Sequence, residues 1–240
     1  MKKIGILGLS LALVFAFTAI AVASASAEEP QYLACVKKKG GNYEKGCAKK
    51  AAVNGAGKAE LEPVANGTKF TSKSKAATFK IGTHTVECKK DTDEGEYTGH
   101  QYDSEKITFS KCIIDGNKKE TCQSTGAAPG TIVTNELISV IEYLNEAQTE
   151  LGVALLGTPV GHWANFSCGS KAFSLVGIAL SKVENNKKGQ KMTFGSTTKY
   201  FEEGEEDEAG LFNGAESVTF TDTDEQSTKG LVVGAYPFSL

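Results

Sequence analysis

The chain has 240 residues, a formal net charge of −3, and 23% charged and 40% hydrophobic residues. This length is enough for one domain with a real core. All 26 basic residues are lysine. Because bidentate recognition of guanine and phosphate relies heavily on arginine, the composition argues against a nucleic-acid partner.

The N-terminus has the pattern of a cleavable signal peptide. Lys2 and Lys3 precede an uncharged apolar run over residues 4–23, and Ala25-Ser26-Ala27 forms a small-x-small cleavage site before Glu28. A retained membrane anchor is the alternative, because the run is nearly long enough to span a bilayer. We expect cleavage after residue 27, a secreted or cell-surface protein, and membrane contact only through the signal peptide.

Residues 28–60 are rich in lysine and glycine and have little apolar periodicity. Residues 28–90 contain 13 lysines and 6 acids, and residues 91–240 contain 11 lysines and 23 acids. The pattern predicts an extended N-terminal segment, pinned at most by its own cysteines. A solvated, flexible arm is the simplest interpretation, and contact with cell-wall polymers or anionic lipid headgroups is the alternative.

From residue 61 onward, short β-branched and aromatic runs recur between turn-forming residues. About ten short strands with this spacing predict one all-β domain over 61–240, an antiparallel sandwich or barrel. The candidate strands are 68–71, 77–89, 106–114, 131–133, 137–144, 151–156, 163–168, 172–183, 191–201, 217–221 and 231–238. The predicted turns include 91–95, 115–118 and 185–189.

The segment 137–156 fits two structures. Leu137, Val140, Ile141 and Leu144 fall near helical spacing, with Asn135 as a possible N-cap. The β-branched residues and a second apolar arm favour a hairpin of residues 137–144 and 151–156 instead. We expect the hairpin.

Six cysteines are present, an even number, and no C-x2-C pair favours zinc. In an exported chain they predict up to three structural disulfides. The Asp115-Gly116 turn signal predicts a hairpin that joins Cys112 to Cys122. A local bridge from Cys35 to Cys47 would close the polar loop between them, and elimination then leaves Cys88 with Cys168.

A resemblance extends over roughly residues 76 to 220. It is carried by Val86-Glu87-Cys88, Gly95-Glu96-Tyr97-Thr98-Gly99, the segments 107–112, 122–124 and 130–135, and Trp163–Gly169. These segments are similar to a group of exported actinobacterial proteins of unassigned function. Members of the group often have Pro or Gly where this chain has Glu136 and Ser139, which also favours the hairpin. The resemblance implies a β-rich exported domain, and it supplies no substrate, cofactor or catalytic residue.

No arrangement of residues indicates a catalytic site or a cofactor. His84, His100 and His162 are expected to be structural or surface residues, and no G-x-S-x-G elbow nominates a serine. Asp91, Asp93 and Glu96 are candidate ligands of a calcium ion, but they do not fit the EF-hand spacing. A plain turn is the preferred interpretation of that acidic segment.

The sequence therefore favours a disulfide-bonded, exported β domain that is not an enzyme and binds something at or outside the cell surface. Cell-envelope polymers and a small apolar ligand are the candidate partners. Three alternatives stay open. A purely structural surface protein would have neither a cavity nor a cleft. A lipocalin-like carrier would have an apolar barrel cavity, and an extracellular hydrolase would have a cleft with paired carboxylates or a Ser/His pair.

Overall fold

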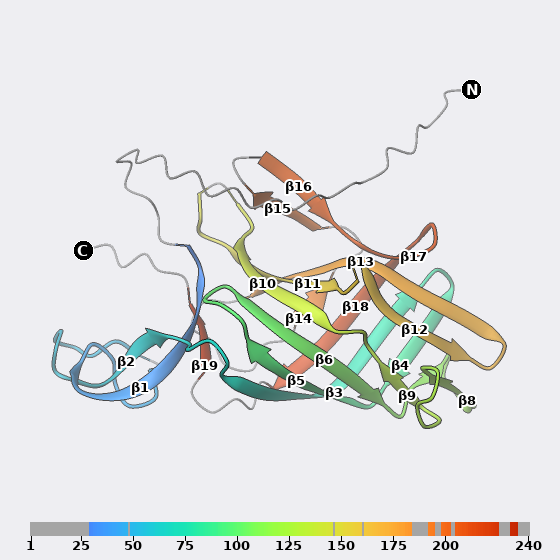
Figure 1. Ribbon diagram of the computed structural model, residues 1–240, viewed down its shortest axis with the longest axis horizontal. Coiled ribbons are helices and arrows are strands. Elements are labelled where there is room, and N and C mark those ends of the chain that lie inside the picture. Colours follow the sequence, from blue (N-terminus) through green and yellow to red (C-terminus); the bar gives the residue numbers. More distant parts are fainter. Residues whose placement is uncertain are drawn as a thin grey trace.

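The computed structural model describes most of the chain, and the described part is built from strands (Figure 1). The described residues are 29–47, 49–145, 147–159, 161–183, 192–194, 198–202, 205–225 and 231–234. The predicted signal peptide, residues 1–27, and the predicted turn 185–189 lie outside them. Within the described part every strand pairing is antiparallel and no helix occurs, so the all-β prediction is confirmed.

A large sheet closes on itself as a ring. Its hydrogen-bonded path runs β3–β5–β6–β10–β11–β13–β17–β18, and β18 pairs again with β3. Strands β4, β7, β8 and β12 complete a second path from β3 to β13, β9 pairs with β6, and β14 pairs with β18. The bounds are β3 (Lys69–Ile81), β4 (His84–Cys88), β5 (Lys90–Tyr97), β6 (Tyr102–Ser110), β7 (Ile113–Ile114), β8 (Asn117–Gln123), β9 (Thr131–Val133), β10 (Leu137–Tyr143), β11 (Leu151–Gly157), β12 (His162–Cys168), β13 (Lys171–Val183), β14 (Met192–Phe194), β17 (Leu211–Asn213) and β18 (Glu216–Glu225).

Two smaller sheets accompany the ring. β1 (Gln31–Gly41) pairs with both β2 (Gly57–Pro63) and β19 (Leu231–Gly234), and β15 (Thr198–Glu202) pairs with β16 (Glu205–Ala209). The β1–β2 hairpin extends away from the ring in Figure 1. The N-terminal segment predicted to be merely extended therefore contains two paired strands.

Several local predictions are confirmed and one is wrong. β10 and β11 form the expected hairpin, with Leu137 opposite Gly157 and Tyr143 opposite Leu151. Asp115 and Gly116 both have positive φ, 49° and 69°, as a tight Asp-Gly hairpin turn requires. Residues 91–95, predicted to be a turn, are instead the middle of strand β5. Alternate residues of that segment face the ring interior. The prediction was wrong because Asp and Gly are typical turn residues, and their composition alone does not reveal the pairing with a neighbouring strand.

The core lies inside the ring and is dominated by aromatic side chains. Phe79, Phe109, Trp163 and Phe220 are all at most 1% exposed. The Phe79 and Phe220 rings stack with centroids 4.8 Å apart, and Phe109 meets Phe79 edge to face at 5.1 Å. This packing follows from strand alternation, which sends every second side chain inward.

Four cysteines form a line across neighbouring strands and are joined in two disulfides. Cys88 pairs with Cys112, and Cys122 pairs with Cys168, with Cα–Cα distances of 4.0 and 4.1 Å. These are distances typical of the narrow pairs in an antiparallel ladder. The predicted partners, Cys112 with Cys122 and Cys88 with Cys168, are therefore wrong.

The hairpin does bring Cys112 and Cys122 together, but through the backbone: the Cys122 N–H donates to the Cys112 carbonyl oxygen. The Cys112 N–H donates instead to the Gly130 carbonyl oxygen, and each sulfur bonds to the cysteine of the strand on its other side. The predicted bridge between Cys35 and Cys47 is present, and within the described residues no cysteine is free.

Candidate functional site

One end of the ring interior is lined by carboxyl and hydroxyl groups. Asp91 and Asp93 are two residues apart on β5, so both side chains point inward, where they lie opposite Ser74 and Ser72 of β3. The Ser72 hydroxyl donates to Asp93 and the Ser74 hydroxyl donates to Asp91. All four side chains are buried, so the two strands share a ladder of serine–aspartate hydrogen bonds inside the fold.

The small sheet contributes to this interior cluster. Tyr32 of β1 is buried, its N–H donates to the His100 carbonyl oxygen in the β5–β6 turn, and its hydroxyl lies 2.6 Å from the Ser139 hydroxyl of β10. Asp103 of β6 accepts hydrogen bonds from the Tyr32 and Ser139 side chains. The Tyr32 ring also packs on Tyr97, with centroids 5.1 Å apart. Tyr32 therefore closes this end of the ring.

Burial changes the acidity of these groups. The pKa of Asp93 is raised to about 7, because desolvation and the neighbouring Asp91 raise it by more than the Ser72 hydrogen bond lowers it. The pKa of Asp103 is likewise raised to about 7, because desolvation and, to a smaller extent, Asp93 outweigh the hydrogen bonds from Tyr32 and Ser139. Among the described residues, one carboxyl oxygen of Asp93 and one of Asp103 have no hydrogen-bond partner. The cluster can therefore gain or lose protons near neutral pH, although it is closed to a substrate.

The candidate calcium ligands do not converge. Asp91 and Asp93 face the interior, whereas Glu96 lies on the opposite face of the same strand because strand side chains alternate. In the described part of the chain, no group of three histidine, cysteine or acidic residues is close enough to hold a metal ion. The acidic segment therefore serves as a strand with a polar inner face.

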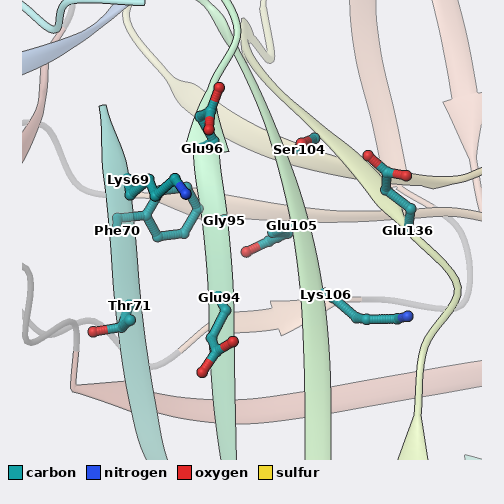
Figure 2. A pocket seen from close by; sticks show the side chains of 10 residues that line it. All are labelled: Lys69, Phe70, Thr71, Glu94, Gly95, Glu96, Ser104, Glu105, Lys106 and Glu136. Atoms are coloured by element: carbon teal, nitrogen blue, oxygen red, sulfur yellow. The ribbon is translucent and has the colours of Figure 1, made fainter. Parts of the chain in front are cut away.

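An open surface groove of about 410 Å³ crosses β3, β5 and β6 (Figure 2). Phe70 and Gly95 are both in its lining, and the Phe70 ring packs against Gly95, where a Cβ atom would lie 2.4 Å from Phe70 Cζ. Its lining contains four glutamates, Glu94, Glu96, Glu105 and Glu136, and two lysines. Both lysines lie in cross-strand pairs, because Lys69 is opposite Glu96 and Lys106 is opposite Glu94. Such cross-strand pairs stabilise a sheet whether or not a ligand binds.

The three histidines lie apart. His84 begins β4 and its Nδ1 lies 2.9 Å from Asp115 Oδ2, while His100 lies beyond the far end of β5 and His162 begins β12. The Asp115 pKa is lowered by the Thr85 N–H and by His84. A histidine oriented by a carboxylate resembles two members of a catalytic triad. The pair is half-exposed at a hairpin end, and the Phe173 ring lies beside His84, with ring centroids 6.2 Å apart.

Sequence reasoning missed Asp103, Ser72, Ser74 and Tyr32 as members of the interior cluster. The signal was present in Ser72-Lys73-Ser74 and Asp91-Thr92-Asp93, where small polar residues alternate with period two. That alternation marks a strand with a polar inner face, but it does not say which side of the sheet is covered.

Comparisons of the chain with protein-family models, with curated proteins and with solved structures gave no match. Among the described residues, no helix has the length and apolar character needed to cross a bilayer. The three disulfides are typical of a protein that folds in an oxidising environment.

Proposed function

We propose that the chain is an exported, non-catalytic β domain that binds a ligand at or outside the cell surface. The observation that carries this proposal is the packing of the ring interior. Aromatic side chains occupy one half, and a serine–aspartate cluster closed by Tyr32 occupies the other. Binding is therefore assigned to the outer surface, where the groove over β3, β5 and β6 and the lysine-rich β1–β2 hairpin are exposed.

Export is supported by two independent features. The sequence predicts a signal peptide, and all six cysteines are in disulfides. Disulfides persist outside the cytosol and are rare within it, where glutathione and thioredoxin keep thiols reduced.

A carrier with an apolar cavity fits the interior poorly. A lipocalin-like barrel needs a lumen lined, but not filled, by apolar side chains. Here Trp163 lies 5.4 Å from Phe220 and 6.1 Å from Phe79, measured between ring centroids, and all three rings are buried. These contacts place ring against ring where a ligand would have to lie.

A hydrolase receives little support from the described contacts. The His84–Asp115 pair is the arrangement closest to a catalytic one, yet among the described residues no serine or cysteine hydrogen-bonds to His84. The buried aspartates are closed to solvent and bond to serines of the same sheet. We therefore assign the carboxylates a structural role.

The test is to express the full chain in an exporting host and to recover it from the medium and the cell surface. We expect a mature chain that begins at Glu28 and binds saturably to envelope material from its source organism. We expect no hydrolysis of any substrate in a panel of esters, glycosides and peptides. An unprocessed chain confined to the cytosol would overturn export. A hydrolytic activity abolished by His84→Ala would overturn the non-catalytic assignment, with Asp115→Asn as the companion variant.

A further inference from the structure

The β1–β2 hairpin is a small folded unit with its own core. Its strands pair from Leu33 opposite Pro63 to Lys37 opposite Ala59 and continue, past a bulge, to Gly41 opposite Gly57. Its apolar core is formed by Leu33, Cys35, Tyr43, Cys47, Ala59 and Leu61. The Cys35–Cys47 disulfide joins the loop between the strands to β1. The distal half of the hairpin, residues 37–58, is therefore held in place and is not a free arm.

Lysine dominates the surface of this distal half. Seven lysines and one acid, Glu44, occur between residues 37 and 58, a net charge of +6, and all seven lysines are exposed. Lys38 pairs with Glu62 at 3.7 Å. Five of the seven lysines have no acidic partner within salt-bridge distance among the described residues: Lys37, Lys39, Lys45, Lys49 and Lys58.

The charge is segregated along the sequence. Residues 91–240, which include most of the ring, contain 11 lysines and 23 acids. Like charges held together by a disulfide and a packed core repel one another, and counter-anions relieve that repulsion. A negatively charged partner is thus attracted by the hairpin and repelled by the acidic part of the molecule. The charge distribution favours an approach from the hairpin end.

We propose that the distal half of the hairpin, residues 37–58, binds an extended polyanion of the cell envelope, a linear polymer that carries repeated phosphate or carboxylate groups. This inference deepens the proposed function, and its cellular role rests on export.

The side chain of lysine determines which property of a polyanion the hairpin can recognise. Lysine presents a compact charge on a flexible stem and lacks the planar fork with which arginine grips one phosphate in a fixed geometry. A surface made only of lysines therefore responds to the density of negative charge along a chain. Binding of this kind releases condensed counterions, so the affinity falls steeply with salt.

The test uses the purified, oxidised mature chain and two probes, inorganic polyphosphate and polygalacturonate, which separate phosphate from carboxylate chemistry. The hairpin variant carries Lys37→Gln, Lys39→Gln, Lys49→Gln and Lys58→Gln. The matched control carries Lys80→Gln, Lys90→Gln, Lys118→Gln and Lys119→Gln, four exposed lysines of the ring that lie outside the groove. Calorimetry at 50 and 200 mM NaCl gives the affinity and its salt dependence, and circular dichroism verifies that each variant is folded.

With about four contacts, the wild-type affinity for at least one probe should fall about 50-fold between the two salt concentrations. The hairpin variant should lose at least tenfold in affinity at 50 mM NaCl, and its slope of log affinity against log salt should fall by about three. The control should bind as the wild type does.

Vesicles of anionic phospholipid serve as a third, comparison probe. Three results would overturn the inference: no binding to either polymer, equal loss in the control, or binding to the vesicles alone. Salt-sensitive self-association that the hairpin variant abolishes, with no polymer binding, would assign the lysines to a second copy of the chain instead. Because these measurements use purified protein, a negative result leaves the proposed export and binding role standing. Failure of export would leave the polymer measurement intact.

Discussion

The two halves of the ring interior are built on opposite principles. Around the cysteine line, Phe79, Phe109 and Phe220 pack ring against ring, and each is at most 1% exposed. Toward the β5–β6 turn, the same strands β3, β5 and β6 turn serines and aspartates inward instead. Asp91 lies directly opposite Phe109 in the ladder, so the two halves meet within one pair of strands.

The two halves should therefore contribute differently to the free energy of unfolding. Apolar burial contributes roughly 25 cal/mol per Å² of surface removed from water, whereas a buried carboxyl must recover its desolvation cost through hydrogen bonds or by staying protonated. We expect the aromatic half to supply the stability and the polar half to make it depend on pH. Substitutions in each half should therefore have different signatures.

The largest effect is expected in the aromatic half. Phe79→Ala removes a ring that contacts Phe109, Phe166 and Phe220, and should lower the free energy of unfolding by about 3–5 kcal/mol at every pH. Urea denaturation at pH 5 and pH 8 measures this loss. A loss under 1 kcal/mol would show that the rings do not form the core.

The second-largest effect on stability is expected from the two disulfides that join Cys88 to Cys112 and Cys122 to Cys168. Replacing both Cys122 and Cys168 by serine opens a link over 46 residues and should cost about 3 to 4 kcal/mol on the chain-entropy model. The same double change at Cys35 and Cys47, 12 residues apart, should cost less and should leave the aromatic core intact. Thermal unfolding followed by near-UV circular dichroism distinguishes the two, and a larger effect at the hairpin would contradict this order.

In the polar half, Asp93→Asn should raise stability in a pH-dependent way. The folded-state pKa of Asp93, about 7, lies above its ordinary value of 3.8, so folding favours the protonated form. Its ionisation therefore destabilises the folded state progressively from about pH 4 to pH 7, and the full cost applies above pH 7. At about 1.4 kcal/mol per pKa unit, the cost of ionising Asp93 in the folded state is at most about 4 kcal/mol. Because the surrounding structure relaxes, we expect Asp93→Asn to raise the free energy of unfolding by about 2 kcal/mol at pH 8.

Denaturation curves at half-unit steps from pH 4 to pH 8.5 test this sign. Asp93→Asn should flatten the pH dependence and match the wild type near pH 4. Asp115→Asn is the control, because the Asp115 pKa is lowered and any effect of its titration lies below pH 4. A wild-type domain that gains stability as the pH rises from 4 to 7, and loses that gain in Asp93→Asn, would contradict the account.

The smallest effect is expected where the small sheet meets the polar half. Tyr32→Phe removes the hydroxyl that lies 2.6 Å from Ser139 and keeps the ring that packs on Tyr97. The loss should be about 1 kcal/mol. Hydrogen exchange should show faster opening at Tyr32 and His100 with little change in the aromatic core. Unchanged exchange at both residues would mean that Tyr32 does not close the ring.

Much of the fold could be predicted from the sequence, because strand alternation and turn residues are local signals. The hairpin of β10 and β11 and the Asp115-Gly116 turn are examples. The β5 strand could not, because Asp91-Thr92-Asp93-Glu94-Gly95 has the composition of a turn and only its partners Ser72 and Ser74 reveal it as a strand.

The disulfide pairing and the interior cluster depend on contacts between distant segments. Cys122 and Cys168 are brought together by the pairing of β8 with β12, which no local pattern encodes. Tyr32 and Ser139 are 107 residues apart in the chain, so their contact follows from the closed ring alone. The even number of cysteines predicts that they are bonded but says nothing about their order.

The central claim is that the oxidised chain forms a closed ring across which the cysteine line is bonded strand to strand. Peptide mapping by mass spectrometry, on non-reduced protein collected outside the cell, tests it most directly. We expect three linked pairs, Cys35–Cys47, Cys88–Cys112 and Cys122–Cys168, with no free thiol. A peptide that links Cys112 to Cys122, or any cysteine that reacts with a thiol reagent before reduction, would contradict it.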